Sequence, residues 1–231
     1  MTAPRPWSVY RPRPLTQRSP SVWTVDDDVP GLPGADRRMS IIRRSDGSLV
    51  FFNAIPVADE TLAQVKALGT PAHLLLPNQY HALDAAAFVE RLGVTAWAPD
   101  VAVSALASRV ACQPVSAFPA GPDLRLITVE GFVTREFVLL FGDTLFTADL
   151  VTNAPHGTGV MGLVMRLVGF TGPSPKLPKP VRRRVQRDRE AVKSVLLELA
   201  SLPGVTRLIP SHGGLVEGDV AAVLRQVAAG I

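Results

Sequence analysis

The sequence has little cysteine and little histidine. Among its 231 residues there is one cysteine, Cys112, and four histidines, His73, His81, His156 and His212. A single cysteine excludes an internal disulfide and fits a reducing compartment such as the cytoplasm. We expect Cys112 to be an inert, partly buried side chain.

Long hydrophobic runs are also missing. No window reaches eighteen uninterrupted apolar residues, and the N-terminus lacks an apolar stretch, so we expect neither a membrane anchor nor a secretory signal. Hydrophobic residues make up 47% and charged residues 19%, which excludes global disorder. The net charge of +4 is small and gives no strong sign of a nucleic-acid partner. These features predict a soluble cytoplasmic protein.

Residues 1–22 are rich in proline and arginine and lack apolar periodicity, which predicts an extended arm. This arm either docks on a partner or lies over its own domain with Trp7 and Tyr10 as anchors. Residues 23–231 are long enough for one large domain.

Helical and strand patterns alternate along this domain. Apolar residues at helical spacing predict helices over 59–68, 84–92, 188–201 and 219–229. Short apolar runs predict a hairpin around Asp46 and Gly47 and strands over 73–76, 95–98, 124–130, 136–141, 144–148 and 205–209.

Two of these strands are followed by side chains that could form a site. The apolar run 137–141 and the strand after it lead to Asp149, and the strand over 205–209 leads to His212 in a glycine turn. Polar groups just past buried strands lie at a sheet edge, where sites commonly form.

The motifs GDTLFTAD (142–149) and PSHGG (210–214) resemble the second half of the metallo-β-lactamase fold. The resemblance implies an α/β (α+β) protein, a four-layer αβ/βα sandwich with two mostly antiparallel sheets and helices outside. It also implies that Asp149 and His212 are metal ligands.

The loop 77–84 departs from that family's pattern, in which a cluster written HxHxDH supplies further ligands. Asn78 and Tyr80 fall where the first two histidines belong, whereas His81 and Asp84 lie nearby but out of register. The chain therefore resembles a divergent branch with a degenerate metal site. If a metal binds, His81 is the best third ligand.

Two functions remain open. In the first, His81, Asp149 and His212 hold one weakly bound zinc ion in a hydrolase of an ester, thioester, lactone or phosphoester. His81 and Asp84 would then serve catalysis, with Asp84 as proton acceptor, and Asn78, Tyr80 and His156 would contact the small-molecule substrate. In the second, the protein binds no metal and is a ligand-binding or interaction protein.

Residues 157–187 form an insertion in which the apolar stretch 160–170 precedes a basic cluster at 182–184. One interpretation is that residues 160–189 contact an anionic membrane surface or an acidic partner, with Val160, Leu163, Val164 and Leu167 exposed. The alternative is that the apolar part covers the site and the arginines begin a solvated helix.

Overall fold

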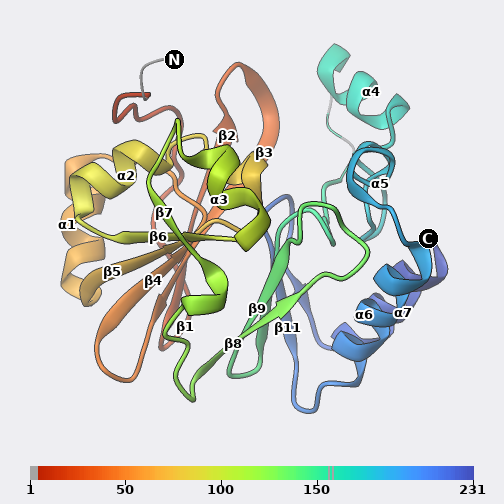
Figure 1. Ribbon diagram of the computed structural model, residues 1–231. Helices are drawn as coiled ribbons and strands as arrows, with labels where there is room; N and C mark the ends of the chain where they lie inside the picture. Colours follow the sequence, from red (N-terminus) through yellow and green to blue (C-terminus); the bar gives the residue numbers. More distant parts are fainter. Residues whose placement is uncertain (1–4, 156, 158) are drawn as a thin grey trace. The chain divides into compact units, whose positions relative to one another are not determined.

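The structure, a computed structural model, describes all residues except 1–4, 156 and 158. It consists of two compact units (Figure 1). Unit 1 comprises residues up to 30 together with 37–119, and unit 2 comprises 31–36 and 120–231. Among the described residues, no helix is long and apolar enough to cross a membrane.

Unit 1 is built on a seven-stranded sheet with the strands in sequence order. The strands are β1 (Thr16–Ser19), β2 (Val22–Val29), β3 (Leu32–Arg43), β4 (Ser48–Phe52), β5 (Thr70–Leu75), β6 (Thr95–Ala98) and β7 (Cys112–Pro114). Strands β4 to β7 run parallel, and β3 pairs with β4 in antiparallel fashion.

Helices join the parallel strands of unit 1, because parallel neighbours need a crossover connection. These helices are α1 (Asp59–Leu68), α2 (Ala85–Leu92) and α3 (Asp100–Leu106), with short 3-10 turns η1 (Gln79–His81) and η2 (Val115–Ala117). Helix α2 ends at Gly93, whose φ of 67° is the left-handed conformation that glycine adopts without strain. Its Phe88 packs edge-on against Phe51 of β4, with ring centroids 5.0 Å apart. This contact joins helix and sheet in one core.

Unit 2 contains a five-stranded sheet in the order β12-β11-β10-β9-β8. Its strands are β8 (Leu124–Thr128), β9 (Phe137–Phe141), β10 (Thr144–Thr147), β11 (Arg207–Pro210) and β12 (Val216–Glu217). Its helices are α4 (Gly159–Leu167), α5 (Lys179–Val185), α6 (Arg189–Ser201) and α7 (Val220–Ala229). Helices α6 and α7 lie side by side (Figure 1). They begin at Asp188 and Asp219, whose carboxylates accept hydrogen bonds from main-chain N–H groups of the first turn.

The four predicted helices are confirmed to within one residue at their ends. Residues 1–22 were predicted to form an extended arm outside the domain. Residues 16–19 instead form strand β1, which pairs with β2. Trp7 anchors the arm to its own unit, since its indole Nε1 donates to the Val57 carbonyl at 3.0 Å and its ring stacks on Phe88. Tyr10 is only partly buried.

Candidate metal-binding site

The two principal candidate ligands follow neighbouring strands of unit 2. Strands β10 and β11 run parallel, with Thr147 opposite Pro210 at their ends. Asp149 lies two residues beyond β10 and His212 two residues beyond β11. Because parallel strands end at the same sheet edge, both side chains emerge at one place.

Main-chain contacts hold the two loops together at this edge. The Ser211 N–H and hydroxyl both donate to the Thr147 carbonyl, at 2.8 and 3.0 Å, and the Asn153 N–H donates to the His212 carbonyl at 3.0 Å. Gly213 has φ of 86°, and a Cβ at this position would lie 2.1 Å from the Asn153 carbonyl oxygen. Any residue other than glycine would therefore force the loops apart.

A buried carboxylate also shapes the loop that carries Asp149. Glu136 has no solvent exposure, and its Oε1 accepts a hydrogen bond from the Leu150 N–H at 2.9 Å. The Thr147 hydroxyl donates to the Val151 carbonyl at 3.0 Å. Glu136 was not identified from the sequence. A glutamate directly before a strongly apolar strand is unusual, and this could have indicated a buried carboxylate.

Asp149 and His212 meet as expected. The His212 Nε2 lies 3.9 Å from the Asp149 Oδ1, and both side chains are largely buried. The other ring nitrogen, Nδ1, lies 2.6 Å from the main-chain carbonyl of Asp36. A carbonyl can only accept, so Nδ1 carries a proton, and in the neutral imidazole Nε2 presents its lone pair on the side of Asp149. Phe170 packs edge-on against the imidazole, with centroids 5.7 Å apart.

This pair fits a divalent metal ion. Zinc is bound by histidine nitrogen and carboxylate oxygen at about 2.0–2.2 Å, so two ligands of a tetrahedral ion are roughly 3.4 Å apart. The observed 3.9 Å needs a movement of about half an ångström to reach that spacing. Metal-binding histidines usually donate their second N–H to a carbonyl or carboxylate, as His212 does to Asp36.

His81 lies in unit 1 and is oriented in a similar way. Its Nδ1 is 2.9 Å from the Asn53 Oδ1, and the Asn53 amide NH₂ donates to the Arg38 carbonyl at 3.0 Å. The second bond fixes which end of the amide faces His81, so the His81 Nδ1 is the donor and Nε2 carries the lone pair. Asn53 was not identified from the sequence.

The remaining residues of the loop 77–84 have contacts of their own. Asn78 is buried, and its side-chain oxygen accepts from the Tyr80 N–H at 2.8 Å, which caps the 3-10 turn η1. Tyr80 is 48% exposed. Substrate contact by either residue stays a prediction. His156 lies outside the described residues.

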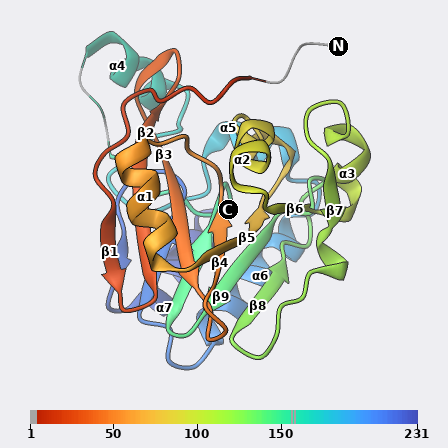
Figure 2. The same ribbon diagram turned by 90° about the vertical axis from the view of Figure 1, so that its left-hand side faces the viewer.

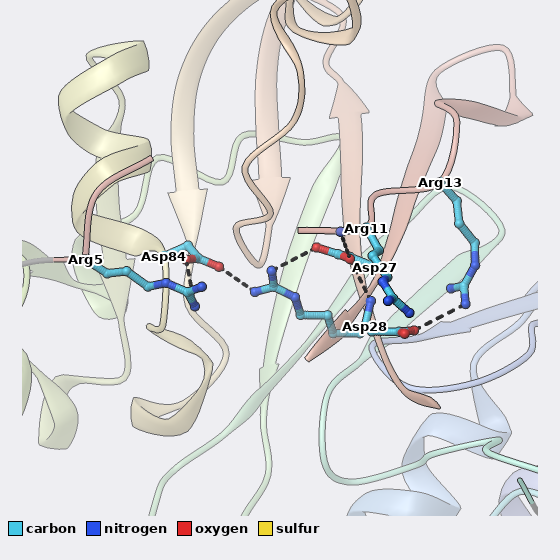
Figure 3. Close-up of polar contacts among 7 residues, drawn as sticks. Arg5, Arg11, Arg13, Asp27, Asp28 and Asp84 are labelled. Carbon is cyan, nitrogen blue, oxygen red and sulfur yellow. Dashed lines mark hydrogen bonds and ion pairs between the residues drawn. The ribbon is translucent and has the colours of Figure 1, made fainter. Parts of the chain in front are cut away.

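Asp84 belongs to a buried ion-pair network in unit 1. Its Oδ2 lies 2.5 Å from an Arg37 nitrogen, and a second Arg37 nitrogen is 3.1 Å from Asp27. Arg5 of the arm is 3.6 Å from the other oxygen of Asp84 (Figure 3). Two guanidinium groups thus surround the carboxylate, which favours a structural role over the predicted role as proton acceptor.

The arm contributes further contacts to this network. The Arg11 N–H donates to the Asp27 carboxylate at 2.9 Å, and Arg13 lies 3.5 Å from Asp28 (Figure 3). The residues 5–13 are therefore fastened to unit 1 at several points.

No protein-family model matches the sequence, and no curated protein does. Solved structures match over nearly the whole chain. A metallo-β-lactamase from Pontibacter korlensis is 14% identical, with 96% of this chain and 100% of that chain covered and a TM-score of 0.64. The metallo-β-lactamase FIM-1 from Pseudomonas aeruginosa in its mono-zinc form is 12% identical, with 96% of each chain covered and a TM-score of 0.63. A metallo-β-lactamase from Hirschia baltica is 14% identical, with 95% of this chain and 98% of that chain covered and a TM-score of 0.64.

These similarities define the class of fold. The chain has the metallo-β-lactamase fold, with mixed α/β structure and two sheets, so the predicted fold class is confirmed. At identities this low the similarity shows only the fold, because proteins with one fold can catalyse different reactions.

Proposed function

We propose that the protein is a metal-dependent hydrolase that binds one divalent ion, by preference zinc, through His81, Asp149 and His212. The observation that carries the proposal is the pair Asp149 and His212, in which the Asp36 carbonyl holds the imidazole with the Nε2 lone pair beside a carboxylate.

His81 is proposed as the third ligand because of its chemistry. Asn53 sets the same ring tautomer in His81 that Asp36 sets in His212. Two nitrogens and one carboxylate leave a coordination position open, as catalytic zinc sites do.

A bound divalent ion would supply a Lewis acid that polarises a carbonyl or phosphoryl oxygen of the substrate. The chain's own residues orient the site: Asp149 provides negative charge, and His212 and His81 are held by their second ring nitrogens. Phe170 shields one side of the His212 ring. This arrangement suits hydrolysis of an ester, thioester, lactone or phosphoester. Tyr80, with its exposed phenol, is proposed to contact the substrate.

A second candidate function is a metal-free ligand-binding protein with the same fold. The loop 77–84 favours it, because the Asn78 side chain caps a 3-10 turn and Asp84 forms ion pairs with Arg37 and Arg5. Asn78 and Asp84 therefore do not supply metal ligands, whereas the histidine cluster at the corresponding loop of the metallo-β-lactamase family does.

Metal analysis separates the two functions. Protein purified without chelators or affinity metal is assayed for bound metal, and metal-depleted protein is titrated with Zn²⁺ and with Co²⁺, whose absorption reports nitrogen and oxygen ligands. We expect up to one ion per chain and hydrolysis of a panel of ester, thioester, lactone and phosphoester substrates.

The variants Asp149→Asn, His212→Asn and His81→Asn should each weaken binding of Co²⁺ and abolish any hydrolysis. His73→Gln is the matched control, since His73 packs against Trp97 and Phe118 in a structural aromatic cluster. Unchanged Co²⁺ binding in all three ligand variants would refute the metal site and favour the ligand-binding function.

A further inference from the structure

Helix α4 projects from unit 2 beyond α5 (Figures 1 and 2). Four apolar side chains on α4 and one directly after it are exposed, with exposed fractions from 43% to 82%. They are Val160, Leu163, Val164, Leu167 and Val168. We name these five residues the α4 face. Their spacing of i, i+3, i+4, i+7 and i+8 places them on one side of a helix.

The α4 face differs from the other exposed apolar residues of unit 2. In the described part of this unit, the other large apolar side chains that are exposed are Leu32, Val133 and Leu197, which lie far apart in the sequence. Single exposed apolar residues are normal on protein surfaces, whereas a contiguous exposed face indicates a binding surface.

The segment after α4 is held in place by main-chain contacts. Thr152 and Lys176 exchange two main-chain hydrogen bonds of 3.0 Å, and the Gly172 N–H donates to the Ala154 carbonyl at 2.9 Å. Leu177 is buried in the core of unit 2. The projection of α4 is therefore built on a fixed base.

Positive charge is concentrated in the same segment. Between Asp149 and Asp188 the sequence contains seven Lys or Arg residues and no Asp or Glu: Arg166, Lys176, Lys179, Arg182, Arg183, Arg184 and Arg187. The rest of the chain has 17 Lys or Arg and 20 Asp or Glu, a net charge of −3, so this segment accounts for the positive charge of the whole protein.

Two of these charges, Arg166 and Lys179, lie on α4 or directly beside its end. Arg166 is exposed on α4 itself, and Arg183 is exposed on α5. The Lys179 stem packs against Gly169, since a Cβ on that glycine would lie 2.6 Å from the Lys179 Cδ. The exposed ammonium group of Lys179 is thus placed next to the C-terminal end of α4.

We propose that the α4 face and the basic residues of α4 and α5 form a docking surface for an anionic lipid membrane. The nine-residue helix is about 14 Å long, which is too short to span a bilayer but suits a helix lying in the interface. A lipid surface offers an apolar layer for the α4 face and phosphate groups for the arginines. Because the segment has no acidic residue, its exposed basic side chains complement anionic headgroups without a competing carboxylate in the same segment.

Vesicle sedimentation of the full chain tests this surface. We expect the protein to pellet with vesicles of phosphatidylcholine and phosphatidylglycerol at a ratio of three to one, and far less with phosphatidylcholine alone. Binding should fall when the salt concentration is raised from 0.1 to 1 M, because the Debye length shortens from about 10 to about 3 Å. Equal binding to both vesicle types, or to neither, would overturn the proposal.

Paired variants separate the apolar from the charged contribution. Leu163→Gln with Leu167→Gln should weaken vesicle binding at least about tenfold through lost apolar burial, whereas Leu197→Gln, an exposed leucine on α6, should not. Arg166→Gln with Arg183→Gln should weaken it about 25-fold, at about fivefold per charge. Arg109→Gln with Arg225→Gln removes the same charge from exposed positions elsewhere and should have little effect.

Thermal melting confirms that each variant is folded. Light scattering tests a second copy of the chain as the occupant of the α4 face. A dimer that dissociates in the variant Leu163→Gln with Leu167→Gln, together with no binding to anionic vesicles, would contradict the membrane assignment.

Discussion

His81 donates a hydrogen bond of 2.9 Å to the side-chain oxygen of Asn53, which itself has φ of 68° and lies buried at the end of β4. Asn53 thus does two things at once: it adopts a left-handed conformation that few residues tolerate, and it orients the imidazole.

Substitutions at Asn53 can separate these two roles. Asn53→Gly keeps the backbone conformation and removes the amide, so we expect metal affinity to fall about 10- to 100-fold, as for other residues that orient metal-binding histidines. Asn53→Ala should weaken affinity similarly and in addition lower the free energy of unfolding by about 1–2 kcal/mol. Titration with Co²⁺ and urea unfolding measure the two effects. Unchanged Co²⁺ affinity in Asn53→Gly would show that His81 is not a ligand.

Gly213→Ala should disturb the Asp149 and His212 loops. The new Cβ meets the Asn153 carbonyl oxygen at 2.1 Å and φ is 86°, so we expect a loss of more than about 2 kcal/mol in the free energy of unfolding. Gly204→Ala is the control, because Gly204 has a similar φ of 74° and no atom within 4 Å of its Cβ position. It should cost about 1 kcal/mol. Equal losses in urea unfolding would mean that the contact with Asn153 is unimportant.

Asp84 and Asp59 both form ion pairs of 2.5 Å, with Arg37 and Arg91, but in different surroundings. Asp84→Ala leaves the largely buried Arg37 with one carboxylate partner fewer, which should cost about 3–5 kcal/mol. Asp59→Ala breaks a pair whose aspartate is 83% exposed and should cost less than about 1 kcal/mol. Unfolding by urea measures both. A stable Asp84→Ala protein that has lost hydrolysis would support the role as proton acceptor instead.

Asp143 should make a pH-dependent contribution to stability. The Thr206 hydroxyl donates to its carboxylate at 2.6 Å, and this bond is the main reason that the pKa of Asp143 is lowered in the folded protein. Because the folded pKa lies below the unfolded one, the stabilisation is fully present above pH 4 and is lost as the pH falls through the folded pKa.

Thr206→Val removes this hydrogen bond with little change in shape. The variant should be less stable than the natural protein at pH 7, and the difference should shrink in urea unfolding at about pH 3. A difference that is the same at both pH values would show that the carboxylate charge contributes nothing.

The sequence predicted the strands around Asp149 and His212 because their apolar runs are continuous and end at glycine turns. It did not predict β2, which contains Asp26, Asp27 and Asp28 in succession, residues that strands usually avoid. In the fold, Arg38 binds the Asp26 carboxylate at 2.6 Å, and Arg37 binds Asp27. Such pairing between strands brings residues together that are not adjacent in the sequence, so the local pattern gives no sign of it.

The candidate site was predictable to a similar extent. Asp149 and His212 stand in recognisable motifs at strand ends, whereas Asn53 acts through its backbone conformation and a single amide orientation, which composition and spacing do not reveal. The exposure of Val160, Leu163, Val164 and Leu167 was one of two interpretations of the apolar stretch, and the structure agrees with it. The sequence alone could not decide between the two, because an apolar face at helical spacing is equally suited to covering a core and to docking on a partner.

The acceptor that orients His212 is the main-chain carbonyl of Asp36, which is present whatever side chain stands at position 36. A mutational scan would therefore leave this bond intact at every substitution and assign position 36 no importance. Its contribution would become visible only by chemistry that alters the main chain, such as replacing the following amide with an ester, which weakens the carbonyl as an acceptor while every side chain stays in place.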